Sequence, residues 1–222
     1  MLLELRNVSK SFESGEGQVT VLNDLSLQLS TGQSLALTGE SGAGKSTLLH
    51  LVAGLERPDH GEILIKGQDI TKLDDGGLAA IRRQSIGLVF QQFNLIPALT
   101  IGDNLSFQAR LAGRYDRDWI AHLSQNLGLE TLLARYPEEI SGGQQQRVAV
   151  GRALALRPDL ILADEPTGNL DEENGQAVLS LFLRLIAESG AGLLMVTHSA
   201  RIAAACETRR HLSRGQLQAL DP

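Results

Sequence analysis

Three clusters of residues in this chain have the types and spacing needed to hold and cleave a polyphosphate. The first is the run GESGAGKST at 39–47, which fits the pattern G-x-x-x-x-G-K-[ST]. Its glycines let the backbone wrap phosphate oxygens without Cβ clashes, so that N–H groups donate at close range. Lys45 supplies a positive charge, and the Ser46 hydroxyl can ligate Mg²⁺. The residues predicted to bind nucleotide here are Gly39, Glu40, Ser41, Gly42, Ala43, Gly44, Lys45, Ser46 and Thr47.

The sequence around this loop supports that interpretation. An apolar run at 35–37 precedes the loop, and apolar residues at helical spacing follow it. A helix that starts near Lys45 would direct the positive end of its dipole at the phosphates. The alternative is a chance glycine-rich turn between a strand and a helix, which this placement disfavours.

The second cluster is a pair of adjacent acids, Asp164 and Glu165, at the end of the apolar run 160–163. In proteins with such a phosphate loop, a carboxylate at a strand tip holds Mg²⁺, and we assign this role to Asp164. Glu165 could orient or deprotonate the attacking water as a general base. Adjacent carboxylates beside a buried strand are costly unless a cation is near. Taken alone, the pair could equally be a solvated exit from a strand.

The third cluster is ISGGQ at 140–144. Ser141 can N-cap the helix that follows, and the two glycines expose backbone N–H groups at its N-terminus, where anions bind. A flexible turn is an equally good interpretation of the isolated string. The cluster resembles the LSGGQ signature of ABC ATPases, with isoleucine for the first leucine, and it lies between the other two clusters, as in that family. The residues that would contact a second chain's ATP are Ser141, Gly142, Gly143 and Gln144.

The resemblance to ABC ATPases extends over essentially the whole chain. Phe12 stands where the family has an aromatic residue that stacks on adenine, and residues 169–171 match the D-loop. Gln91 matches the Q-loop glutamine, which senses Mg²⁺ and the γ-phosphate, and His198 matches the switch histidine. A lone histidine at a strand end is more often a polar cap, but the ordered set favours function. The resemblance implies ATP and Mg²⁺ as cofactors, catalytic Glu165, His198, Gln91 and Lys45, and metal ligands Ser46, Gln91 and Asp164.

Two kinds of apolar pattern predict the elements that position these residues. Leucines at 3 and 5, and at 25, 27 and 29, alternate with polar residues, which is typical of an antiparallel sheet. The runs at 35–37, 86–90, 160–163 and 193–196 are continuously apolar, as in parallel strands covered on both faces. We therefore predict an α/β fold: a P-loop NTPase core with a mostly parallel sheet, an N-terminal antiparallel β subdomain and an inserted helical subdomain. One domain would span 1–222, with the core at 1–90 and 158–222 and the helical subdomain at about 91–157.

Composition limits the class of partner. The chain has 222 residues and a formal net charge of −6, which argues against a dominant nucleic-acid surface, so no nucleic acid is expected. Cys206 is the single cysteine, which fits a reducing compartment. No apolar stretch is long enough to span a bilayer. If the protein works at a membrane, it must bind a protein that spans it.

Three further segments resemble the LolD/MacB branch of the family, namely VFQQFNLIP at 89–97, YPEE at 136–139 and ADEPTGNLD at 163–171. That branch serves lipoprotein release, macrolide or peptide export, and cell division, with membrane partners that have few transmembrane helices. The chain departs from it at Ser199, where aspartate is common, and at Gly151, where alanine is common. The resemblance implies a peripheral ATPase subunit on the cytoplasmic side of the bacterial inner membrane that drives such a permease.

The same resemblance implies a head-to-tail homodimer with each ATP between one chain's Lys45 and the other's Ser141. The apolar side chains Phe93, Leu95, Ile96 and Leu99 either dock the permease or pack within the helical subdomain, and the sequence favours neither. The alternative function is a soluble ABC ATPase acting on DNA or ribosomes. Such proteins carry a coiled-coil insertion or two cassettes, which this sequence does not show. A nucleotide switch without hydrolysis is disfavoured by the intact catalytic residues.

Overall fold

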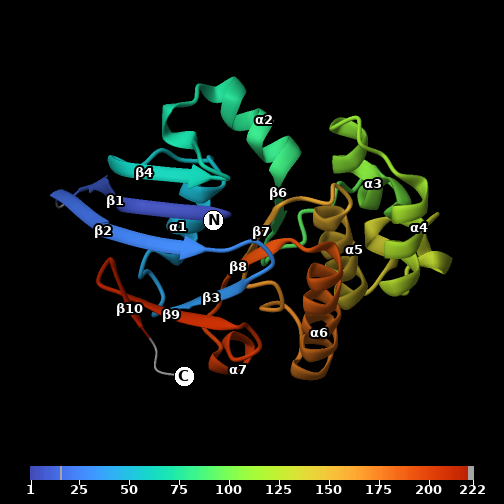
Figure 1. The fold of residues 1–222 in the computed structure, drawn as a ribbon. Coiled ribbons are helices and arrows are strands. Elements are labelled where there is room, and N and C mark those ends of the chain that lie inside the picture. The colour runs from blue at the N-terminus through green and yellow to red at the C-terminus, as the bar shows by residue number, and fades with distance from the viewer. Residues whose placement is uncertain (16, 220–222) are drawn as a thin grey trace. The chain divides into compact units, whose positions relative to one another are not determined.

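The computed structural model describes residues 1–15 and 17–219 and divides into two compact units. The first contains Met1–Arg82 and the chain from Gly192 onward, and the second contains Arg83–Ala191 (Figure 1). The phosphate loop and His198 belong to the first unit, whereas Gln91, the acid pair and the signature belong to the second. Helix α2 (Asp75–Ser85) contains the boundary between the units. The units do not divide the chain at 90 and 158, so the helical subdomain expected at 91–157 remains a prediction.

The first unit contains the predicted antiparallel sheet. Its strands are β1 (Leu3–Ser14), β2 (Gly17–Leu29), β4 (His60–Ile65) and β5 (Gln68–Asp69), in the order β2-β1-β4-β5. Leu25, Leu27 and Leu29 are buried, while Ser26 and Gln28 between them are exposed. The period of two therefore separates a core face from a solvent face, as expected of an antiparallel sheet. A short 3₁₀ helix, η1 (Ile70–Lys72), follows β5.

Parallel strands in the same unit position the phosphate loop. Strand β3 (Ser34–Thr38) pairs in parallel with β8 (Gly192–Val196) and with β9 (Thr208–Ser213), while β10 (Gln216–Ala219) pairs antiparallel with β9. Every residue of β8 is buried, which explains its continuous apolar run. Helix α1 (Lys45–Val52) follows β3 and buries four aliphatic side chains, and the short helix α7 (Ala200–Ala203) follows β8.

The second unit is mostly helical. Strands β6 (Ile86–Val89) and β7 (Leu160–Asp164) pair in parallel, and residues 90–159 between them form helices, turns and loops. The helices are α3 (Ile101–Leu111), α4 (Arg117–Asn126), η2 (Glu130–Leu132), η3 (Pro137–Glu139), α5 (Gly142–Leu154) and, after β7, α6 (Glu172–Ser189). Helix α5 packs against both α3 and α6. None of the helices described in the structure is long and apolar enough to cross a membrane.

Close packing explains the glycine at 151. A Cβ added to Gly151 in α5 would lie 2.4 Å from Cδ1 of Leu105 and 2.6 Å from Cδ1 of Leu127. Both leucines are buried, at 0% and 1% exposure. The missing side chain therefore lets α3 and the end of α4 approach α5 closely.

Gly151→Ala is therefore expected to lower the free energy of unfolding. Overpacking a core costs about 1–3 kcal/mol, which exceeds the roughly 1 kcal/mol gained when alanine replaces a helical glycine. Urea denaturation measures the difference. Gly175→Ala in α6 is the control, because its Cβ would meet Thr167 Cβ at an ordinary 3.5 Å. Equal stability changes in the two variants would contradict the packing argument.

Candidate functional site

The phosphate loop joins β3 to α1, and its glycines are required by conformation and by space. Gly39, Gly42 and Gly44 have φ angles of 154°, 78° and 98°. A Cβ on Gly39 would lie 2.4 Å from the carbonyl oxygen of Leu212, and one on Gly44 would lie 2.7 Å from Cγ1 of Val21. Larger residues at these positions would displace the loop from the strands beside it, so the glycines maintain its path.

Lys45 and the start of α1 concentrate positive charge at this loop. The Lys45 side chain is 8% exposed, and its ammonium donates to the carbonyl oxygens of Gly39 at 2.9 Å and Glu40 at 2.8 Å. Gly44 precedes the helix and offers no side-chain cap, so capping side chains do not occupy the first N–H groups of α1. Ser46 is exposed and Thr47 is half-buried in this first turn. A helix start of this kind binds anions.

The first unit also places His198 beside the phosphate loop. His198 follows β8, is exposed, and lines a cavity of about 500 Å³ together with Gly39, Glu40 and Ser41. A γ-phosphate held by the loop would therefore be accessible to an imidazole from the end of the next parallel strand.

Phe12 lies on the antiparallel sheet of the same unit. It is 40% exposed and pairs with Val19 on β2, and the Lys10 ammonium lies 5.2 Å from its ring centroid. Strand β2 also contributes Val21, whose Cγ1 would lie 2.7 Å from a Cβ added to Gly44 of the phosphate loop. An exposed ring on the strand next to this contact is suited to stacking on a base.

Sequence reasoning missed two residues of the cavity beside His198. Arg209 and His211, both on β9, line it as well. Strand pairing aligns His211 with Thr38 of β3, and the Thr38 hydroxyl lies 3.1 Å from His211 Nδ1. The feature of the sequence that could have identified these two residues is the run of three consecutive basic residues at 209–211. They add basic groups to the wall of the cavity.

In the second unit, Gly168 allows Glu165 and Gln91 to lie close together. Glu165 follows Asp164 at the end of β7 and has a φ of 47°, a left-handed conformation that is uncommon outside glycine. The Gly168 N–H donates to the Glu165 carbonyl at 2.9 Å and closes a turn. A Cβ on Gly168 would lie 3.3 Å from Cβ of Glu165 and 3.1 Å from Nε2 of Gln91. The structure thus places the proposed base and the Q-loop glutamine beside the same glycine.

Reciprocal amide hydrogen bonds join the Q-loop to the D-loop. Nδ2 of Asn169 donates to the Gln91 carbonyl at 2.8 Å, and Nε2 of Gln91 approaches Oδ1 of Asn169 at 3.4 Å. Two residues on, Asp171 N-caps α6 by accepting from the Asn174 N–H at 3.0 Å. The Asn174 side chain donates to the same carboxylate, and these bonds lower the pKa of Asp171.

The signature forms the N-terminus of α5. As predicted, Ser141 caps this helix: its hydroxyl accepts from the Gln144 N–H at 3.3 Å, while the Gln144 side chain accepts from the Ser141 N–H at 2.9 Å. A Cβ on Gly142 or Gly143 would have its nearest neighbours at 3.6 Å and 4.0 Å, respectively. Packing within the chain therefore leaves room for side chains at both glycines.

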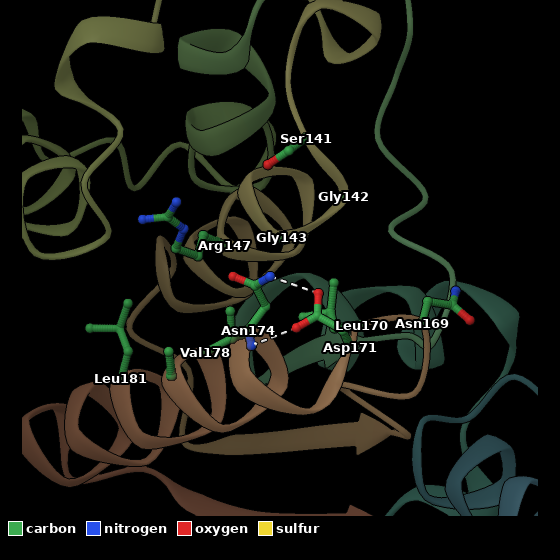
Figure 2. Close-up of a pocket in the computed structure, with 11 residues that line it drawn as sticks. Ser141, Gly142, Gly143, Arg147, Asn169, Leu170, Asp171, Asn174, Val178 and Leu181 are labelled. Carbon is green, nitrogen blue, oxygen red and sulfur yellow. Dashed lines mark hydrogen bonds between the residues drawn. The ribbon is translucent and has the colours of Figure 1, made fainter.

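A cavity of about 430 Å³ adjoins this helix start. Figure 2 shows how residues of the signature, the D-loop and α6 surround it. Its lining includes Ser141, Gly142 and Gly143 from the signature and residues 169–171 from the D-loop. Backbone N–H groups at the start of a helix make this wall of the cavity suitable for an anion.

The available metal ligands suit a hard cation. Asp164 is a half-buried carboxylate and Ser46 is an exposed hydroxyl. Mg²⁺ prefers such oxygen donors, uses one or two carboxylates and keeps several waters. Among the described residues no group of three or more His, Cys, Asp or Glu side chains could hold a metal ion. Asp164 and Ser46 each offer an oxygen donor of a kind that Mg²⁺ binds.

Comparison with known proteins extends these observations. A family model described as ABC transporter matches residues 22–168. The uncharacterized ABC transporter ATP-binding protein YbbA of Escherichia coli is 41% identical over 220 residues, which cover 98% of this chain and 96% of that protein. The lipoprotein-releasing system ATP-binding protein LolD of Shewanella oneidensis is 39% identical over 222 residues, again covering 98% and 96%.

Solved structures agree with the sequence comparisons. The ATP-binding cassette MJ0796, in a dimeric post-hydrolysis state bound to ADP and phosphate, matches with a TM-score of 0.89 and 36% identity over 100% of both chains. A second dimeric structure of that cassette has a TM-score of 0.88. The fold, the ordered motifs and these relatives lead to one conclusion: the chain belongs to the ABC transporter family, as an ATP-binding and ATP-hydrolysing subunit.

Proposed function

We propose that this subunit hydrolyses Mg-ATP to drive a permease with few transmembrane helices, as in the LolD/MacB branch, from the cytoplasmic face of the inner membrane. The observation that carries the hydrolytic role is the placement of Glu165 and Gln91 against Gly168. The branch assignment draws support from the 39% identity to a protein named as the ATP-binding part of a lipoprotein-releasing system.

Each site residue has a distinct role in this proposal. The backbone of 39–47 and the Lys45 ammonium hold the β- and γ-phosphates, and the Phe12 ring stacks on adenine. Ser46, Asp164 and Gln91 would hold Mg²⁺, which would supply positive charge to neutralise the phosphates. Glu165 takes a proton from water as the water oxygen attacks the γ-phosphorus and the bond to the β-phosphate oxygen breaks. His198 donates a hydrogen bond to a γ-phosphate oxygen.

A second copy of the chain completes the site. Residues Ser141 to Gln144 of one copy bind the ATP held by Lys45 of the other. Two observations support this arrangement. Gly142 and Gly143 have room for side chains within their own chain, so their small size is suited to contact with something outside it. The similar MJ0796 cassette is described as dimeric.

The permease docks on the helical subdomain, which we place at residues 91–157. The candidate side chains Phe93, Leu95, Ile96 and Leu99 are all half-buried, so each has surface left for a partner. The buried Asn104 fixes this loop: its amide nitrogen donates to the Ile96, Leu99 and Thr100 carbonyls at 3.0 Å each, and its oxygen accepts from the Ile96 N–H at 2.8 Å. A loop held in one conformation loses little entropy on binding.

Affinity capture from detergent-solubilised membranes tests this proposal. The tagged chain should recover an integral membrane protein whose sequence contains few transmembrane segments. Leu95→Glu should reduce that recovery, because it places a charge in the docking loop. Leu111→Glu, at an apolar residue that is 59% exposed at the end of α3, is the matched control and should not reduce it. Recovery of DNA or ribosomes without a membrane protein would favour the soluble-ATPase alternative.

A further inference from the structure

Gln146 is a buried amide with an unusual hydrogen-bonding state. It lies in the second turn of α5, two residues after the signature, and is 1% exposed. Its Nε2 donates to the carbonyl oxygen of Pro166, the residue that follows Glu165. Its Oε1 is buried and has no hydrogen-bond partner among the described residues. The amide nitrogen is therefore hydrogen-bonded while the amide oxygen is not, and the nitrogen contacts the loop that carries the proposed base.

That unpaired oxygen makes a purely structural role a poor explanation for the amide. A buried polar atom without a partner costs about 1–3 kcal/mol, whereas an apolar side chain of the same shape can be nearly neutral. Methionine or leucine would fill this position in α5 without a polar atom to satisfy. What an amide offers in this position is therefore the hydrogen bond that its N–H group donates to the Pro166 carbonyl.

The backbone around Pro166 depends on such a restraint. Glu165 has a φ of 47°, and the residue after it is a proline, whose ring also restricts the conformation of the residue that precedes it. Sparsely populated backbone conformations persist when the surrounding structure holds them. The bond from Gln146 fixes the orientation of the peptide that follows Pro166 and thereby the turn from which the Glu165 side chain projects.

Helix α5 also holds the Q-loop through a second buried side chain. Arg152, 8% exposed, donates to the carbonyl oxygens of Asn94 at 2.6 Å and Phe93 at 3.0 Å, just after Gln91. The one helix therefore carries the signature at its start and restrains the loops of both Gln91 and Glu165. Gln146 is its contact with the loop that carries the proposed base.

We infer that Gln146 is a positioning residue for the general base of its own chain, acting through the Pro166 carbonyl. This inference rests on the proposed role of Glu165. It differs from a role in the signature, which would act on the nucleotide held by the second copy. The two roles therefore predict loss of turnover at different sites of the dimer.

Mixed dimers separate the two roles. In both dimers one copy carries Glu165→Gln, so that one base remains. In the cis dimer, Gln146→Met is on the copy that retains Glu165; in the trans dimer, it is on the copy that carries Glu165→Gln. Methionine keeps the length and the unbranched stem but cannot donate. The reference is the dimer of an unaltered copy with a Glu165→Gln copy.

We expect kcat of the cis dimer to fall about 10- to 100-fold below the reference, because a misplaced catalytic group costs rate on that order. The KM for ATP should stay within about twofold, and the trans dimer should match the reference. Ser106→Ala, which removes another buried side-chain bond to a carbonyl in the same unit, controls for general loss of stability and should leave kcat unchanged.

Each other outcome overturns the inference. Loss in the trans dimer alone would place Gln146 in the signature. Equal loss in both dimers would make its role structural, and no loss in either would make the bond to Pro166 dispensable. Failure of the base assignment itself is distinguishable, because the dimer with Glu165→Gln on both copies would then retain full turnover.

Discussion

Glu165→Gln is expected to abolish ATP turnover while ATP binding persists and the dimer accumulates. Glutamine has the shape of glutamate and can still hydrogen-bond a water, but it cannot take the proton. Removing a general base costs roughly 10²–10⁴ in rate. ATP would remain bound between two copies, since hydrolysis is what releases them. Phosphate release measures turnover, and light scattering with and without Mg-ATP measures dimer formation.

A matched control for this substitution lies eight residues further along. Glu173→Gln changes the same charge on an exposed residue in the first turn of α6, within the same unit. It should leave turnover unchanged. Full turnover in the Glu165→Gln variant would remove the base assignment, and loss of ATP binding would show that the carboxylate acts in binding rather than in proton transfer.

The local pattern of apolar and polar residues predicted most of the fold, because the residues of each strand indicate which of its faces are buried. The continuous apolar runs correspond to strands β3, β6, β7 and β8, which are buried along most or all of their length. The alternating leucines of β2 became one buried face of an antiparallel strand. The elements that pattern missed have mixed burial, such as β9, where one of six residues is buried. Such a strand is held by pairing with β3, which local periodicity does not encode.

The same limit applies to the site. Its motifs are short strings whose chemistry is local, and the structure places each predicted string on the expected loop or helix start. The contacts that assemble the site span large distances in sequence, as with Gln91 and Asn169 of two predicted strings, 78 residues apart, or Thr38 and the unpredicted His211, 173 apart. Gln146 shows the limit most clearly. It is the third of three adjacent glutamines, and helix rotation alone buries it while its two neighbours stay half-buried.

Lys45→Ala is expected to lose nucleotide binding, with the dissociation constant for ATP rising about 100-fold or more. Truncating one partner of a buried charge pair costs about 2–5 kcal/mol, and each 1.4 kcal/mol is about tenfold in affinity. The variant also leaves the Gly39 and Glu40 carbonyls without the ammonium that they share, so the loop loses an internal restraint as well as a charge. Isothermal titration calorimetry gives the affinity, and circular dichroism confirms that the variant is folded.

Two further variants test whether the loss comes from the ammonium at this position. Lys45→Met keeps the apolar stem but removes the ammonium, so it should bind ATP as poorly as the alanine variant if the ammonium, rather than the stem, is what matters. Lys72→Ala removes one positive charge from an exposed side chain of the same unit, 71% accessible, and should bind normally. Unchanged affinity in Lys45→Ala would contradict the phosphate-loop assignment. Weak binding in all three variants would point to the net charge of the unit, since the loop itself is intact in the Lys72 variant.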